Sequence, residues 1–193
     1  NKLKDIEVPC KGVSDKELYD NLCNVIEKHF SCKTEACWLN IRRIMNNLSK
    51  KNAEYFREYF RPKLPDDLVK DYSEWLSNFD IEAVLDQYHN ELNDFYFYGA
   101  VPIDFKKCSV SHDLCKINIK KHKERGETKL GIVFNTDESD QPGKHWISMY
   151  IDLEGKNLED QPGIYFFDSF GSRPNKEIKV LIKKVQKQMP KDT

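Results

Sequence analysis

Apolar residues recur every three to four positions through roughly the first ninety residues, which is the spacing of one face of a helix. Ser14-Asp15-Lys16-Glu17 has the pattern of a capping box, which marks a helix start. We therefore expect core-packed helices from about residues 14, 34 and 65, and a fourth capped by Asp80. Their apolar stripes are Leu18, Leu22, Val25 and Ile26; Trp38, Ile41, Ile44, Met45 and Leu48; Leu68, Tyr72, Trp75 and Leu76; and Ile81, Val84, Leu85, Tyr88 and Leu92.

The pattern changes in the second half of the chain. Three short apolar runs, at residues 130–134, 146–151 and 164–167, are separated by turn-forming residues and predict strands. The loop-like segment between the second and third runs predicts that they pair as antiparallel neighbours. Pro174 opens a last predicted helix with an apolar side. That side carries Ile178, Leu181, Ile182, Val185 and Met189.

Helices followed by a sheet predict an α+β protein. We place a helical N-terminal arm at residues 1–76 and a mixed core at residues 77–193. The composition supports a folded chain, because 12% of its 193 residues are aromatic although 33% are charged. No run approaches the roughly 18 apolar residues of a membrane span, so we expect no membrane partner. The start lacks Met and an apolar signal core, so we expect a part of a longer chain.

Two groups of three possible ligands could be considered for metal binding: His29 with Cys32 and Cys37, and Cys108 with His112 and Cys115. Neither group has a paired Cys-x2-Cys, so we expect no metal and no cofactor. The Lys-rich chain without a signal sequence favours reduced thiols and a reducing compartment. The six cysteines are Cys10, Cys23, Cys32, Cys37, Cys108 and Cys115.

Charge is distributed unevenly although the formal net charge is only −1. Residues 80–104 hold six acidic residues and no Lys or Arg. Residues 116–129 hold six basic and two acidic residues, and residues 173–193 hold seven and two. The basic segments are candidate surfaces for nucleic acid or an acidic partner, and solvated helix faces are the simpler interpretation.

The candidate chemistry lies around the last two predicted strands. His145 immediately precedes one strand and Asp168 immediately follows the next. In an antiparallel hairpin these two positions meet at the same edge of the sheet. A carboxylate beside an imidazole orients the ring, as in a hydrolytic triad, although such a pair can also be a plain structural hydrogen bond.

The ordered set Gly143-Lys144-His145-Trp146, Ile151-Asp152 and Phe167-Asp168-Ser169 resembles the Ulp1/adenain-type cysteine peptidases. That family contains SUMO-deconjugating enzymes and the polyprotein-processing proteases of large DNA viruses, and the likeness is greatest to the viral members. The resemblance is strong over residues 130–171 and faint elsewhere. It implies a papain-like, Ulp1-like core with a small mixed sheet flanked by helices.

The resemblance also implies roles for individual residues. His145 would deprotonate a cysteine and later protonate the leaving amine, while Asp168 orients His145. Trp146 would wall a narrow channel that admits a Gly-Gly main chain. Asn135, in the matching Asn-Thr-Asp segment, would support the active-site loop.

One departure concerns the nucleophile. The family places its cysteine after the Asp, preceded by a Gln that stabilises the oxyanion. After Asp168 this chain contains no cysteine. We expect that the nucleophile lies beyond residue 193, so that this fragment alone is inactive; the other interpretation is a catalytically dead relative.

Three functions therefore compete. The first is a thiol protease that cuts viral structural polyproteins after Gly-Gly during virion maturation, in the host cytoplasm, the viral factory and the virion. The second is an isopeptidase that removes SUMO or another ubiquitin-like modifier. The third is a non-catalytic binding or capsid-associated module.

Overall fold

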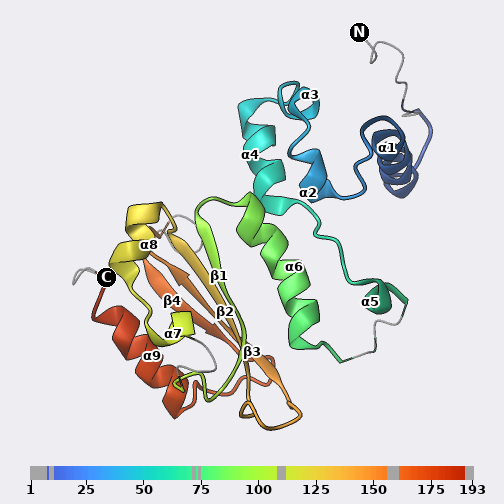
Figure 1. Cartoon of the computed structure of the whole chain (residues 1–193). Coiled ribbons are helices and arrows are strands. Elements are labelled where there is room, and N and C mark those ends of the chain that lie inside the picture. Colours follow the sequence, from blue (N-terminus) through green and yellow to red (C-terminus); the bar gives the residue numbers. More distant parts are fainter. Residues whose placement is uncertain are drawn as a thin grey trace. The chain divides into compact units, whose positions relative to one another are not determined.

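The computed structural model describes residues 8, 11–70, 73, 75–107, 112–155 and 161–189 (Figure 1). The chain divides into two compact units, Asn1–Lys63 and Leu64–Thr193. The functional division expected from the sequence, an arm at residues 1–76 and a peptidase core at residues 77–193, stays a prediction. None of the described helices is both long and apolar enough to cross a membrane.

The N-terminal unit is built from α1 (Asp15–Phe30), α2 (Glu35–Trp38), α3 (Arg42–Met45) and α4 (Lys50–Tyr59). The predicted capping box at Ser14 is present at the start of α1. The single helix expected from residue 34 is wrong, because Ile41 has an extended backbone that separates α2 from α3. Its apolar stripe still reaches the core of this unit, where Ile26, Cys32 and Trp38 are buried.

The expectation of reduced thiols is also contradicted. Cys32 and Cys37 form a disulfide that closes the short loop leading into α2. Cys115 is likewise disulfide-bonded, and Cys23 is the free cysteine among the described residues. Within the described part of the chain, no group of three or more His, Cys, Asp or Glu residues is arranged to hold a metal ion.

The C-terminal unit begins with α5 (Asp66–Lys70) and α6 (Asn78–Glu91). Ser77, and not Asp80, is the N-cap of α6; the Asp80 carboxylate accepts the Ser77 amide at 2.8 Å and completes a capping box. Because this cap starts α6 at residue 78, Trp75 and Leu76 lie outside any helix and are exposed. Tyr72, the remaining member of that predicted stripe, lies outside the described residues.

A four-stranded mixed sheet forms the centre of this unit, in the order β1-β2-β3-β4. The strands are β1 (Phe95–Pro102), β2 (Lys129–Asn135), β3 (Trp146–Asp152) and β4 (Gly163–Phe167). The three predicted strands are confirmed, and β3 pairs antiparallel with both β2 and β4. The sequence prediction missed β1, which pairs parallel with β2. It also missed α7 (His112–Cys115) and α8 (Ile119–Arg125) in the crossover between them.

The core lies between the sheet and α9 (Lys176–Gln186), the last predicted helix (Figure 1). Alternate residues of β2 and β3 face this core, as the period of two in a strand requires. Complete burial of each side chain contributes about 2 kcal/mol, so this packing fixes the strands that position the site. The buried residues are Leu130, Ile132, Phe134, Ile147, Met149, Ile151, Ile178, Leu181 and Val185.

Candidate active site at the β3–β4 edge

The hairpin of β3 and β4 brings His145 and Asp168 together. Ser148 pairs with Phe167, so the residue before β3 and the residue after β4 meet at one edge of the sheet. His145 Nε2 lies 2.7 Å from Asp168 Oδ1. The juxtaposition predicted from the sequence is therefore present, and the catalytic role stays a prediction.

Two hydrogen bonds hold Asp168 in its charged form. The bond from His145 and the bond from the Phe170 backbone amide, at 2.9 Å, keep the pKa of Asp168 below its ordinary value. A charged carboxylate only accepts hydrogen bonds, so Nε2 of His145 carries the hydrogen. In the neutral ring, Nδ1 is then the nitrogen with a lone pair for accepting a proton.

The Phe170 ring covers one face of the imidazole. The two ring centroids are 4.4 Å apart with an interplanar angle of 30°. Phe170 is 79% exposed, so its position is not explained by burial in the core. Phe170 thus contacts both members of the pair, through its backbone amide and its ring, and the sequence analysis did not identify it.

Asn135 anchors the loop that leads to His145. Its Oδ1 accepts the amides of Asp137, at 3.0 Å, and Lys144, at 3.2 Å. The Thr136 amide also donates to the His145 carbonyl at 2.9 Å. Gly143 has φ +92°, and a Cβ there would lie 2.5 Å from Asn135 Nδ2. The loop therefore needs both a glycine at this position and the Asn135 amide beside it.

A second anchor, Asp104, was missed by the sequence analysis. This buried carboxylate accepts the Ser139 amide at 3.0 Å, the Ser139 hydroxyl at 2.8 Å and the Lys107 ammonium at 3.0 Å. Burial raises the pKa of Asp104, but these hydrogen bonds outweigh it and hold the pKa below its ordinary value. An acidic residue after a strand carries no local pattern that reveals such a long-range contact.

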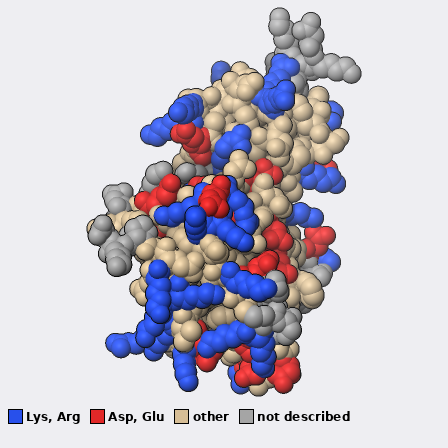
Figure 2. Space-filling model, turned by 60° about the vertical axis from the view of Figure 1, so that its left-hand side comes forward, with Lys and Arg blue, Asp and Glu red and all other residues tan. Residues whose placement is uncertain are grey.

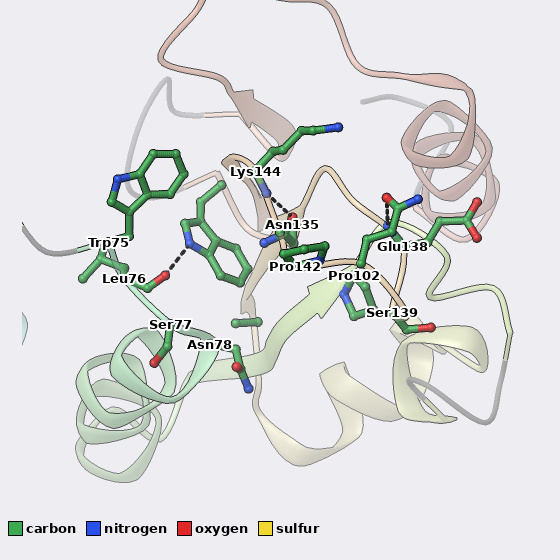
Figure 3. Close-up of a pocket in the computed structure, with 14 residues that line it drawn as sticks. Trp75, Leu76, Ser77, Asn78, Pro102, Asn135, Glu138, Ser139, Pro142 and Lys144 are labelled. Carbon is green, nitrogen blue, oxygen red and sulfur yellow. Dashed lines mark hydrogen bonds between the residues drawn. The ribbon is translucent and has the colours of Figure 1, made fainter.

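A pocket opens beside Trp146 (Figure 3). Its volume is about 540 Å³, and its lining includes Trp75, Asn135, Lys144 and Trp146. The Trp146 indole Nε1 donates to the Leu76 carbonyl at 2.8 Å, which ties the segment before α6 to the start of β3. Trp75, which lies outside any helix, is 80% exposed beside this pocket.

Comparison with known proteins finds similar sequences that are named as thiol or cysteine proteases. A protein of Acanthamoeba polyphaga mimivirus, named as a candidate thiol protease R355, is 38% identical over 112 residues. Cysteine protease S273R of African swine fever virus, isolate Tick/Malawi/Lil 20-1/1983, is 24% identical over 191 residues. The chain is therefore similar in sequence to proteins named as viral cysteine or thiol proteases. The same protein from isolate Tick/South Africa/Pretoriuskop Pr4/1996 is named SUMO-1 cysteine protease and is 23% identical over 190 residues.

The likeness covers much of this chain but only part of its relatives. The chain covers 35% of the mimivirus protein and 67% of the Malawi S273R protease. The crystal structure of the African swine fever virus pS273R protease matches with a TM-score of 0.50 and 17% identity, covering 91% of this chain and 67% of that one. This match shows that the protease relative has the same fold. No family model matches the chain.

Proposed function

We propose that this chain carries the histidine and aspartate of a viral cysteine protease that cleaves polypeptides after Gly-Gly. The observation that carries the proposal is the His145–Asp168 pair, with Nδ1 as the proton-accepting nitrogen at the edge of the sheet. The names of the viral relatives support the protease chemistry. In this proposal the nucleophilic cysteine is contributed by residues beyond 193 in the full protein.

The proposed mechanism moves one proton through His145. Nδ1 takes the proton of the cysteine thiol, and the thiolate attacks the carbonyl carbon of the scissile peptide bond. The imidazolium, stabilised by the Asp168 carboxylate, then gives the proton to the leaving amine as the C–N bond breaks. Water hydrolyses the remaining thioester and restores the thiol.

The pocket beside Trp146 is the proposed route for the substrate. Trp146 is held by its indole bond to Leu76, and Trp75 lies along the same pocket. Flat aromatic walls leave room for a main chain without side chains, which favours glycine at the two positions before the scissile bond. Asn135, which also lines this pocket, fixes the loop that leads from β2 to His145.

A ubiquitin-like modifier is the second candidate substrate, because some relatives are named SUMO-1 cysteine proteases. The basic segments 116–129 and 173–193 extend the proposal to an anionic partner, nucleic acid included. The cytoplasm, the viral factory and the virion are the proposed sites of action.

The deciding experiment uses the full-length protein that contains this chain. A Gly-Gly-X peptide and a folded SUMO fusion are offered separately, and an electrophilic Gly-Gly probe is added before measurement of the intact mass. Cleavage of the short peptide, with one probe attached beyond residue 193, supports the endopeptidase. Cleavage of the folded fusion alone supports the isopeptidase.

His29→Ala is a suitable control, because His29 is an exposed histidine of the N-terminal unit. It should leave both cleavage and labelling unchanged. Binding without turnover or labelling, in a protein whose mass includes the segment beyond residue 193, would mean that the His145–Asp168 pair is a structural relic.

A further inference from the structure

A second pocket, of about 300 Å³, lies in the C-terminal unit between β1 and the α7–α8 segment. None of the residues that line it also lines the pocket beside Trp146. Its lining is mainly polar, whereas a cavity left by imperfect core packing is apolar. This pocket therefore deserves a chemical explanation of its own.

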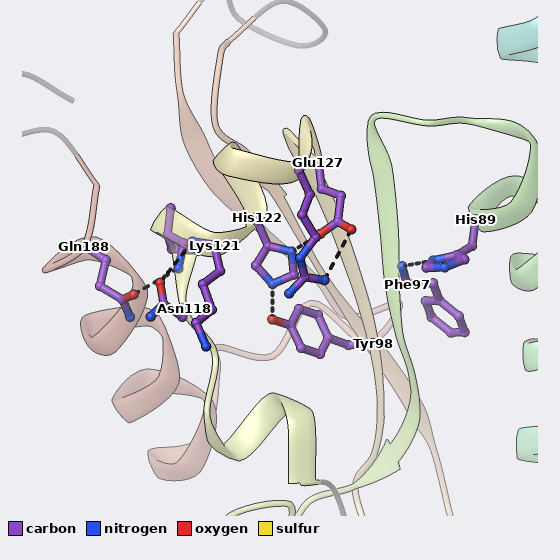
Figure 4. Close-up of polar contacts among 10 residues, drawn as sticks. His89, Phe97, Tyr98, Asn118, Lys121, His122, Glu127 and Gln188 are labelled. Atoms are coloured by element: carbon purple, nitrogen blue, oxygen red, sulfur yellow. Dashed lines mark hydrogen bonds and ion pairs between the residues drawn. The ribbon is translucent and has the colours of Figure 1, made fainter.

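The floor of the pocket is a hydrogen-bonded chain centred on His122 (Figure 4). His122 is only 4% exposed; its Nδ1 contacts Glu127 Oε2 and its Nε2 contacts the Tyr98 hydroxyl, both at 2.5 Å. Burial raises the pKa of Tyr98, so this phenol keeps its proton at neutral pH and donates it to Nε2. Both ring nitrogens are occupied, so His122 supports the pocket and does not itself bind a ligand.

The walls carry more positive than negative charge. Lys116, Lys121 and Arg125 line the pocket, against one carboxylate, that of Asp113. Arg125 is oriented by an ion pair with Glu127 at 3.5 Å. The Lys121 ammonium has no ion pair within the described part of the chain.

Asn118 fixes the position from which Lys121 extends. Its side chain caps α8 by accepting the Lys121 amide at 3.1 Å (Figure 4). The Ile119 amide donates to Gln188 Oε1 at 3.0 Å, which ties α8 to the turn that follows α9. These two hydrogen bonds therefore hold α8, and the cations that it contributes to the pocket, in a fixed position. Figure 2 brings forward the side on which α8 and α9 lie in Figure 1, and it shows many Lys and Arg side chains on that face. Such a face raises the local concentration of anions.

The geometry points to a binding site for an oligophosphate group, a function independent of the proposed protease activity. The three cations, two from α8 and one from the turn before it, suit tetrahedral phosphates, whose oxygens accept several hydrogen bonds at once. The volume corresponds to about ten water molecules, so it exceeds what a single small ion needs. The Asp113 carboxylate repels every anion, so only a ligand with several negative charges gains enough from the three cations to outweigh this repulsion and its own loss of hydration.

The test titrates the 193-residue chain with inorganic tripolyphosphate in an isothermal calorimeter. Lys121→Gln should weaken binding about tenfold, because it removes one charged hydrogen bond. Lys120→Gln is the matched control: its side chain is 86% exposed, pairs with Glu124 and does not line the pocket. We expect that control to change the affinity less than twofold. Equal losses in the two variants would overturn the proposal in favour of a diffuse surface effect.

Asp113→Asn gives a prediction of opposite sign. Removing this carboxylate should tighten tripolyphosphate binding several-fold, which a folding defect would not do. A short DNA duplex forms the second arm and distinguishes a free oligophosphate from the phosphates of a nucleic acid. Competition between duplex and tripolyphosphate, lost in Lys121→Gln, would assign the pocket to nucleic-acid phosphates. Duplex binding without any tripolyphosphate binding would contradict the proposal.

Discussion

Two histidines of the C-terminal unit are bonded to carboxylates, and the proposed function assigns proton transfer to only one of them. His145 contacts Asp168 through Nε2, and its side chain is 20% exposed at the sheet edge. His122 contacts Glu127 through Nδ1, but its other nitrogen is taken by the Tyr98 hydroxyl. A His–carboxylate pair is therefore insufficient evidence of catalysis; the second ring nitrogen and its access to solvent decide the role.

The largest expected effect separates the two histidines by activity. In the full-length protein, His145→Ala should lower kcat on a Gly-Gly-X peptide about a thousandfold or more, because general acid–base catalysis is lost. His122→Ala should lower kcat less than about tenfold once the folded fraction is accounted for. Similar losses in both variants would remove the distinction between the two sites.

The next effect reverses that order and is measured by urea unfolding of the 193-residue chain. His122→Ala should lower the free energy of unfolding by about 2–3 kcal/mol, since Glu127 and the Tyr98 hydroxyl lose a buried partner. His145→Ala should cost less than about 1 kcal/mol, because its pair lies at the edge of the sheet. A larger loss at His145 would indicate a structural role for that residue.

Substitution of the carboxylates sharpens the comparison further. Asp168→Asn should retain measurable peptidase activity, about a tenth to a hundredth of the original kcat, because an amide oxygen still accepts the Nε2 hydrogen but no longer stabilises the imidazolium. Steady-state kinetics on the full-length protein measures this. Activity as low as that of His145→Ala would show that the charge, and not the orientation, is essential.

A smaller effect concerns the stability of the 193-residue chain in acid. The pKa of Asp168 is lowered in the folded state by the hydrogen bonds from His145 and Phe170. Its contribution is therefore present above the unfolded carboxyl pKa of about 3.9 and is lost as the pH falls through the lower folded pKa. The difference in unfolding free energy between the original chain and Asp168→Asn should shrink between about pH 4 and pH 2. A constant difference across this range would contradict the assigned cause.

The smallest effect is expected at Phe170. Phe170→Ala should lower kcat a few-fold, with little change in KM, because the imidazole loses the ring that restricts its motion. In proton NMR spectra of the 193-residue chain, the His145 ring signals should move downfield when the stacked ring is removed. Phe170→Tyr serves as the control and should preserve both kcat and these signals.

The sequence predicted the hairpin site better than the rest of the unit, and the reason is local. His145 and Asp168 flank two strands whose apolar runs and connecting turn are visible within about 25 residues. β1 was missed because its central Tyr96–Gly99 segment has no clear alternation of apolar and polar residues, and its parallel partner β2 lies about thirty residues further along the chain. Pairing over that distance depends on the intervening crossover helices, which were missed as well.

The anchors of the site show the same limit. Asn135 could be proposed because it lies in the Asn-Thr-Asp segment that matches the family, whereas nothing local indicates the contact from Asp104 to Ser139, which spans 35 residues. Phe170 was overlooked because an exposed aromatic after a strand has no periodic pattern that indicates its neighbour. The helix expected around Trp75 was wrong. The apolar spacing there is typical of a helix, but the capping residue Ser77 starts α6 only at residue 78 and leaves Trp75 outside it.

The indole bond from Trp146 to the Leu76 carbonyl joins residues that are 70 positions apart. During synthesis on a ribosome, this bond and the pocket beside it are absent until the chain has grown well past β3 and the sheet has assembled. Contacts of such long range also form late in folding, because the entropy of closing the intervening loop must be overcome first. The segment before α6 therefore stays untied to the sheet until β3 has been made and has paired, and the pocket takes its shape only then.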